Sequence, residues 1–133
     1  MGQWPWPRHH LADLVDKIAE SGVAAIVIDV LLSEPDWLSP ESVVELLPNW
    51  PEYQIAKEAA KRALAFSGGF RNHDETLAHA LSQSNSVLGF ALADNIFGEL
   101  PKTKAGMVNA GDPPNDFLLI FTGGIFALPV LAD

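Results

Sequence analysis

Residues 8–32, RHHLADLVDKIAESGVAAIVIDVLL, decide the fold class of this chain. Apolar side chains in residues 11–19 recur every three or four positions, which predicts an amphipathic helix. Gly22 follows at the position where a left-handed residue commonly ends a helix. Residues 23–32 are almost continuously apolar, with Asp29 as their one charge, which predicts a strand buried on both faces. A helix followed closely by such a strand indicates half of an α/β unit.

The remaining sequence continues this alternation of helix and strand signals. A short helix is predicted from Ser39 to Leu47, and a longer one from Pro51 to Gly68-Gly69. The longer helix has an apolar side formed by Ile55, Ala56, Ala59, Ala63 and Leu64. A third helix is predicted from Asn72 to Leu81, beginning with a capping box of Asn72 and Glu75, and strands are predicted at 86–92, 117–122 and 125–130. Residues 93–115 are rich in Gly, Pro, Asn and Lys, which predicts a loop. We expect a single α/β domain over residues 1–133, with a three-layer, mostly parallel sheet flanked by helices.

Composition excludes several classes of function. The chain has 133 residues, of which 8 are basic and 17 acidic, and its net charge of −9 argues against a nucleic-acid partner. It contains no cysteine, which excludes disulfides, thiolate metal sites and a cysteine nucleophile. The N-terminus has no apolar signal segment, and the most apolar stretch, residues 117–132, is too short and too interrupted for a membrane span. We therefore expect the chain as given to be soluble.

The opening WPWPR, Trp4 to Arg8, is the most unusual segment. Each proline holds the preceding tryptophan in an extended conformation, so Trp4 and Trp6 would face the same way. Arg8 lies at the N-terminal end of the predicted helix, where the helix dipole disfavours a cation. We therefore expect a specific anionic partner, either the carboxylate of Asp29 or Glu34 or a ligand anion. A tryptophan clamp with an internal salt bridge is the favoured interpretation, and a ligand site is the alternative.

Asp29 requires a partner if the strand is buried, because an unpaired buried carboxylate is very costly. A pair with Arg8 is the favoured interpretation. The phospho-acceptor aspartate of a receiver domain is disfavoured, since the chain lacks the acidic pair and the lysine that such a site needs.

Histidines and carboxylates offer a metal-site hypothesis, which the sequence supports weakly. On a helix, Glu75 and His79 share a face, and His73 and Asp74 lie beside them, while His9 and His10 lie far away in sequence. No other ligand spacing supports a metal, and the acidic residues fit the start of a capped helix. Neither a nucleophile elbow nor a glycine-rich phosphate loop occurs. The sequence thus predicts no cofactor and no catalytic centre.

Several segments together resemble the CHASE domain of the second type, a cyclases/histidine kinases associated sensory extracellular domain. These segments are WPWPR and its helix, the pattern Asp-x-x-x-x-Glu-Pro-Asp from Asp29 to Asp36, the pattern Asp-x-x-Leu-Ala-x-Ala-Leu from Asp74 to Leu81, and the strand SVLGFAL. They follow one another in order over about residues 2–92. The chain therefore resembles the N-terminal part of this domain.

The resemblance implies a non-catalytic, extracytoplasmic input domain of a bacterial transmembrane receptor. Its implied partners are a small-molecule or environmental stimulus, a second copy in a homodimer, and the receptor's transmembrane and cytoplasmic output regions. The implied output is an adenylate or guanylate cyclase, a histidine kinase, a diguanylate cyclase or a serine/threonine kinase. The family's preceding strand and second half are missing, so we expect a fragment or an incomplete reading frame. The residues expected to be functionally sensitive are Trp4, Trp6, Arg8, Asp29 and Glu34, followed by Asp74.

Two other hypotheses stay open at the level of the sequence. A small hydrolase-like α/β enzyme would use Asp29 or Glu34 as its base, in a pocket at the carboxyl ends of the strands. A structural fragment without activity of its own would be poorly soluble, because residues 117–132 would lack neighbours in a sheet.

Overall fold

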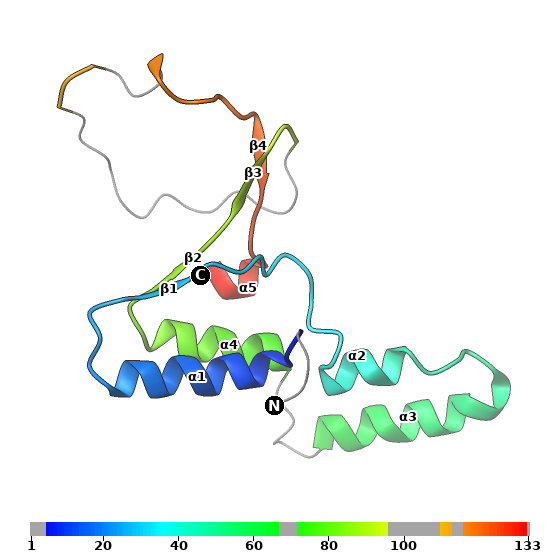
Figure 1. The fold of residues 1–133 in the computed structure, drawn as a ribbon. Helices are drawn as coiled ribbons and strands as arrows, with labels where there is room; N and C mark the ends of the chain where they lie inside the picture. Colours follow the sequence, from blue (N-terminus) through cyan, green and yellow to red (C-terminus); the bar gives the residue numbers. More distant parts are fainter. Residues whose placement is uncertain (1–4, 67–71, 96–109, 113–115, 133) are drawn as a thin grey trace.

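The computed structural model describes residues 5–66, 72–95, 110–112 and 116–132. Within these ranges the chain forms five helices and two small sheets of two strands each (Figure 1). In chain order the elements are α1 (Arg8–Glu20), β1 (Ile26–Ile28), α2 (Pro40–Glu45), α3 (Pro51–Phe66), α4 (His73–Ser82), β2 (Ser86–Leu88), β3 (Ala91–Ala93), β4 (Gly123–Ile125) and α5 (Pro129–Ala132).

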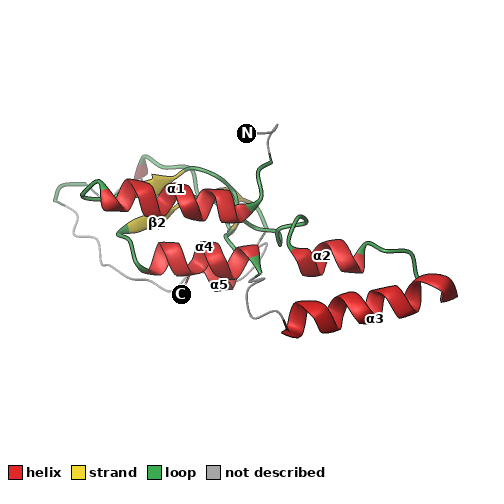
Figure 2. Cartoon of the chain, turned by 90° about the horizontal axis from the view of Figure 1, so that it is seen from below, coloured by secondary structure: helices red, strands yellow, loops and turns green. Residues whose placement is uncertain are grey.

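Two helix–strand units form the body of the molecule. Helix α1 leads into β1 and helix α4 leads into β2, and the two strands pair in parallel with Ile26 opposite Ser86. Helices α1 and α4 pack side by side along the sheet, as Figures 1 and 2 both show. The core between these elements consists of Ala12, Val15, Ile26, Leu32, Leu77, Ala80, Leu81 and Leu131. This arrangement confirms the predicted α/β class.

Local signals place the helix ends as the sequence predicts. Gly22 has a φ of +79°, the left-handed conformation expected of a glycine after a helix. Asn72 is the N-cap of α4, and its side-chain oxygen accepts a hydrogen bond from the backbone N–H of Asp74 at 2.8 Å. Ser39 is the N-cap of α2, but its hydroxyl oxygen accepts from the backbone N–H of His73 at 3.1 Å instead of from its own helix.

The predicted three-layer sheet is not present in the described residues. Of residues 23–32 only Ile26–Ile28 form a strand, and Val27 is 73% exposed between the buried Ile26 and the half-buried Ile28. This alternation is typical of a strand covered on one face, so the expectation of burial on both faces was wrong. The continuous apolar run could not distinguish the two cases.

The C-terminal strands also differ from the sequence prediction. Residues 86–92 form two strands, because β2 pairs with β1 while β3 pairs antiparallel with β4. Strand β4 lies at Gly123–Ile125, and a Cβ on Gly124 would come within 2.8 Å of the carbonyl oxygen of Ala91. Residues 117–120 form no strand and are exposed. Residues 129–132 form the short helix α5, because a proline suits the first turn of a helix.

Helices α2 and α3 form a hairpin that projects from the body (Figures 1 and 2). The side of α3 that faces α2 contains the buried Lys57 and the partly buried Leu64, whereas Ile55, Ala59 and Ala63 are exposed. The apolar face predicted for this helix is therefore mostly turned to solvent. Its predicted stop at Gly68-Gly69, and most of the predicted loop at 93–115, lie outside the described residues. No described helix combines the length and the hydropathy needed to cross a bilayer.

Candidate functional site

Arg8 is a buried arginine at the start of α1 that binds three acidic residues. Its guanidinium group forms an ion pair with the carboxylate of Asp74 and donates to the backbone carbonyl oxygen of Glu34. Its backbone N–H donates to Oδ2 of Asp36 at 2.7 Å. The predicted anionic partner is thus present. Its identity is not the predicted one, because the ion pair is made with Asp74 and not with Asp29.

Asp36 and Asp74 are both buried and are linked to each other. The backbone N–H of Asp36 donates to Oδ2 of Asp74 at 3.1 Å, and Oδ1 of Asp36 accepts from the N–H of Leu38 at 2.9 Å. Burial by itself would raise the pKa of Asp36. Hydrogen bonds from the backbone of Arg8 and Leu38 and from the ring of His73 outweigh burial, so the pKa lies below its ordinary value. Asp36 is therefore held as an anion inside the fold.

His73 connects α4 to this network. Its Nδ1 lies 2.8 Å from Oδ2 of Asp36, and its backbone N–H is bound by Ser39. The ring of His9, from α1, lies beside those of His73 and His10, at centroid distances of 4.4 Å and 4.1 Å. Burial, followed by the nearby His73 and His10, lowers the pKa of His9, against the weaker opposing effect of Asp13 and Asp36. The described residues contain no group of three or more histidines and carboxylates placed to hold a metal ion.

We call the set of Arg8, the Glu34 carbonyl, Asp36, His73 and Asp74 the Arg8 junction. It joins three segments that are distant in sequence: the start of α1, residues 34–36 and the start of α4. Within it, two carboxylates face one guanidinium and one imidazole. Such a set of buried, hydrogen-bonded groups fixes the relative position of the three segments, because removal of Arg8 or Asp74 leaves the other buried without its ion-pair partner.

The residues singled out in the sequence have different locations in the structure. Arg8 and Asp74 meet, and Glu34 contributes its backbone while its side chain is exposed. Asp29 directly follows β1, is exposed and is not part of the junction. Trp6 is partly buried. Trp4, and with it the predicted pair of parallel indoles, lies outside the described residues.

Sequence reasoning missed two members of the junction, Asp36 and the ring of His73. A signal for Asp36 existed, since it ends the Asp-x-x-x-x-Glu-Pro-Asp pattern. The proline before it holds Glu34 in an extended conformation, which exposes the Glu34 carbonyl to a donor. No comparable signal marked His73, whose position beside Asp36 depends on the packing of α1 against α4.

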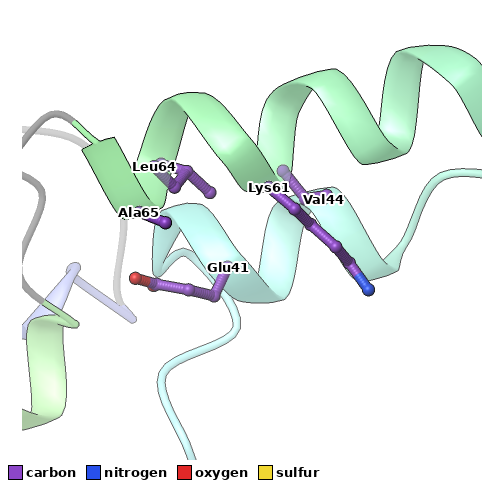
Figure 3. Close-up of a pocket in the computed structure, with 5 residues that line it drawn as sticks. All are labelled: Glu41, Val44, Lys61, Leu64 and Ala65. Carbon is purple, nitrogen blue, oxygen red and sulfur yellow. The ribbon is translucent and has the colours of Figure 1, made fainter.

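A separate surface pocket lies between α2 and α3 (Figure 3). Its volume is about 350 Å³, and it is lined by Glu41, Val44, Lys61, Leu64 and Ala65. Oε2 of Glu41 is buried and has no hydrogen-bond partner among the residues that the structure describes. Neither Asp29 nor Glu34 lines this pocket, so it does not correspond to the pocket predicted by the enzyme hypothesis.

Comparison with protein families identifies the chain. The family model of the CHASE2 domain matches residues 1–118 of the 133 residues, which extends the resemblance beyond residues 2–92. No curated protein and no solved structure matches the chain. CHASE2 domains are sensory domains, typically non-catalytic, that belong to receptors with output domains such as cyclases and kinases. The chain therefore belongs to the CHASE2 domain family.

Proposed function

We propose that this chain is the extracytoplasmic, stimulus-sensing input domain of a bacterial transmembrane receptor, and that it is not itself a catalyst. The match to the CHASE2 family over residues 1–118 carries this proposal. The input domain responds to a small-molecule or environmental stimulus and passes a conformational shift through transmembrane segments. The output is an adenylate or guanylate cyclase, a diguanylate cyclase, a histidine kinase or a serine/threonine kinase.

The Arg8 junction supports this proposal by offering a coupling element. A receptor input needs two arrangements of packed elements whose balance a stimulus can shift. The junction connects α1, α4 and the segment that leads into the α2–α3 hairpin, so a displacement of one of them would shift the others. The side chains of Asp29 and Glu34, on which the enzyme hypothesis depends, are exposed. No observation favours that alternative.

A receptor assay tests the proposal. The coding region and its flanking sequence are expressed in membranes, and basal cyclase or kinase output is measured for the unaltered receptor, for Arg8→Ala and for the control Lys17→Ala. Lys17 is an exposed cation on the same helix. We expect Arg8→Ala to shift the basal output, because the basal output reflects the balance between two states, and Lys17→Ala to leave it unchanged.

Three results would contradict the proposal. Flanking sequence without a membrane segment or an output domain would exclude the receptor, and so would a reporter fusion that places this domain in the cytoplasm. Equal output from a folded Arg8→Ala receptor and the unaltered receptor would exclude the junction as the coupling element.

A further inference from the structure

Three histidines gather where α1 and α4 begin. His9 and His10 lie in the first turn of α1, and His73 is the first residue of α4. The N-terminal end of a helix carries partial positive charge, so it disfavours a protonated imidazole. The centroid of the His9 ring lies 4.1 Å from that of His10 and 4.4 Å from that of His73, so a proton on His9 lies next to both other rings. Two helix dipoles and two neighbouring imidazoles therefore oppose protonation at the same place.

The carboxylates near His9 do little to stabilise a proton on its ring. Asp36, from the segment between β1 and α2, is hydrogen-bonded to His73 and to the backbone of Arg8. Asp13, on the solvent side of α1, attracts a proton on His9 weakly. The Nδ1 atom of His9 is buried and has no hydrogen-bond partner within the described ranges. A proton on His9 thus lacks the carboxylate partner that His73 has.

The segment at this position is the connection to the α2–α3 hairpin. The carbonyl oxygen of Asp36 accepts from the Ser42 hydroxyl at 2.9 Å, and Ser39, the N-cap of α2, is bound by the backbone of His73. Helices α2 and α3 pack mainly on each other and project from the body (Figures 1 and 2). A displacement of α4 from α1 at this end would therefore move the hairpin.

We propose that His9, together with His10 and His73, forms a proton-operated latch between α1 and α4, and that acidification releases the latch and shifts the α2–α3 hairpin. The stimulus is then the proton itself, which deepens and rests on the proposed sensory function. His9 takes up one proton from hydronium, which forms an N–H bond on its ring and leaves a water molecule, and the resulting positive charge is repelled by the partial positive charge of both helix N-termini. The Arg8–Asp74 ion pair joins the starts of the same two helices and remains as the pivot about which they turn.

The direction of the pH dependence follows from the lowered pKa of His9. In the unfolded chain this group has an ordinary pKa of 6.5, so below about pH 6.5 the unfolded or released state binds the proton first. The closed state loses stability as the pH falls from about 6.5 to the lowered pKa and is unaffected above this window. Asp36 does not contribute to this pH dependence. Because its pKa is lowered, its protonation reduces the stability of the fold only at pH values below about 3.8.

A distance measurement on the full 133-residue chain tests the latch. Because the chain has no cysteine, Asp16→Cys on α1 and Glu58→Cys on α3 place two spin labels at exposed positions without background. The distance distribution is recorded from about pH 7.5 to about pH 5, the range in which histidine titrates. We expect a second distance to appear on acidification and the thermal midpoint to fall in the same window.

Variants assign the effect to His9. His9→Gln cannot take the proton, so it should keep the neutral-pH distance throughout, whereas His79→Gln, exposed near the other end of α4, should behave as the unaltered chain. If His9→Gln fails to fold, the exposed His10→Gln replaces it, and removal of one repelling ring should make the acid-induced change smaller. A pH-independent distance in the unaltered chain overturns the latch. So does an acid-induced distance change in His9→Gln, or in His10→Gln where it replaces His9→Gln, that equals the change in the unaltered chain. Such a failure leaves the receptor assay unaffected, since a sensor of another stimulus still shifts its output on Arg8→Ala.

Discussion

At the scale of single residues, the fold depends most on Arg8. Its side chain is buried, and it satisfies acceptors from two other segments that are 26 and 66 residues away in sequence. Burying a guanidinium is tolerated here because the carboxylate of Asp74 and the carbonyl oxygen of Glu34 accept hydrogen bonds from it. The interaction is therefore a condition for the packing of α1 on α4, and not an additional surface contact.

Replacing Arg8 by alanine should lower the free energy of unfolding by about 2–5 kcal/mol, because Asp74 is left as a buried, uncompensated charge. Urea denaturation measures the loss, and the exposed Lys17→Ala on the same helix should change stability by less than about 0.5 kcal/mol. The double variant Arg8→Ala, Asp74→Ala should lose less than the sum of the two single variants. Equal midpoints for Arg8→Ala and the unaltered chain would refute the buried pair.

At the scale of elements, the α2–α3 hairpin depends on Glu45. This carboxylate binds Lys61 at 2.6 Å and Lys57 at 2.9 Å, and these hydrogen bonds, that of Lys61 first, lower its pKa to about 2. Lys57 is itself buried, and it also reaches Oδ1 of Asn49 at 3.3 Å, in the turn between the helices. Its aliphatic stem fills space between the helices while its ammonium group is paired.

Glu45→Gln should loosen the hairpin, since it removes the charge that both lysines contact. The lowered pKa means that the carboxylate stabilises the fold at all pH values above about 4.5 and loses this effect only as the pH falls towards about 2, so neutral pH shows the full difference. We expect faster backbone hydrogen exchange in α2 and α3 and unchanged exchange in α1 and α4. Glu58→Gln removes an equal, exposed charge from α3 and serves as the control; equally fast exchange in both variants would contradict the role of Glu45.

Helices were more predictable than strands, for a physical reason. The signals that begin and end α1, α2 and α4, such as Gly22, Ser39-Pro40 and Asn72, act within a few residues and can be recognised in the sequence. A strand is defined by its partner, so the apolar run around Ile26 did not reveal that one face stays open. The same applies to the site: an anionic partner for Arg8 was predictable from the helix dipole, whereas the choice of Asp74 over Asp29 depends on how α4 packs against α1.

At the scale of the whole molecule, the described surface is unusually apolar in one segment. Residues 117–120, Phe-Leu-Leu-Ile, are 64–84% exposed. Adjacent apolar side chains of this size are commonly covered by another surface, whereas the net charge of −9 opposes close approach of two copies. At physiological ionic strength this repulsion is largely screened beyond about 8 Å, so the apolar segment should dominate.

We therefore expect the chain to associate reversibly as its concentration is raised, which sedimentation velocity at about 150 mM salt would reveal. Leu119→Lys combined with Ile120→Lys should shift the association to higher concentration. Ser82→Lys combined with Gln83→Lys makes the same change in net charge at exposed polar positions and should have little effect. Equal effects of the two pairs would show that charge, and not the apolar segment, governs association.

The parallel pairing of β1 with β2 also has a consequence for the order of folding. Ile26 and Ser86, which pair directly, are 60 residues apart, and the α2–α3 hairpin lies between them. Closing so long a loop costs entropy before any stabilising contact forms between the strands, which makes this step slow. Helices α2 and α3 contact mainly each other, at short sequence separation, so the hairpin can form early, which shortens the effective length of the loop. We expect the hairpin to form first, and the docking of α4 on α1 to limit the folding rate.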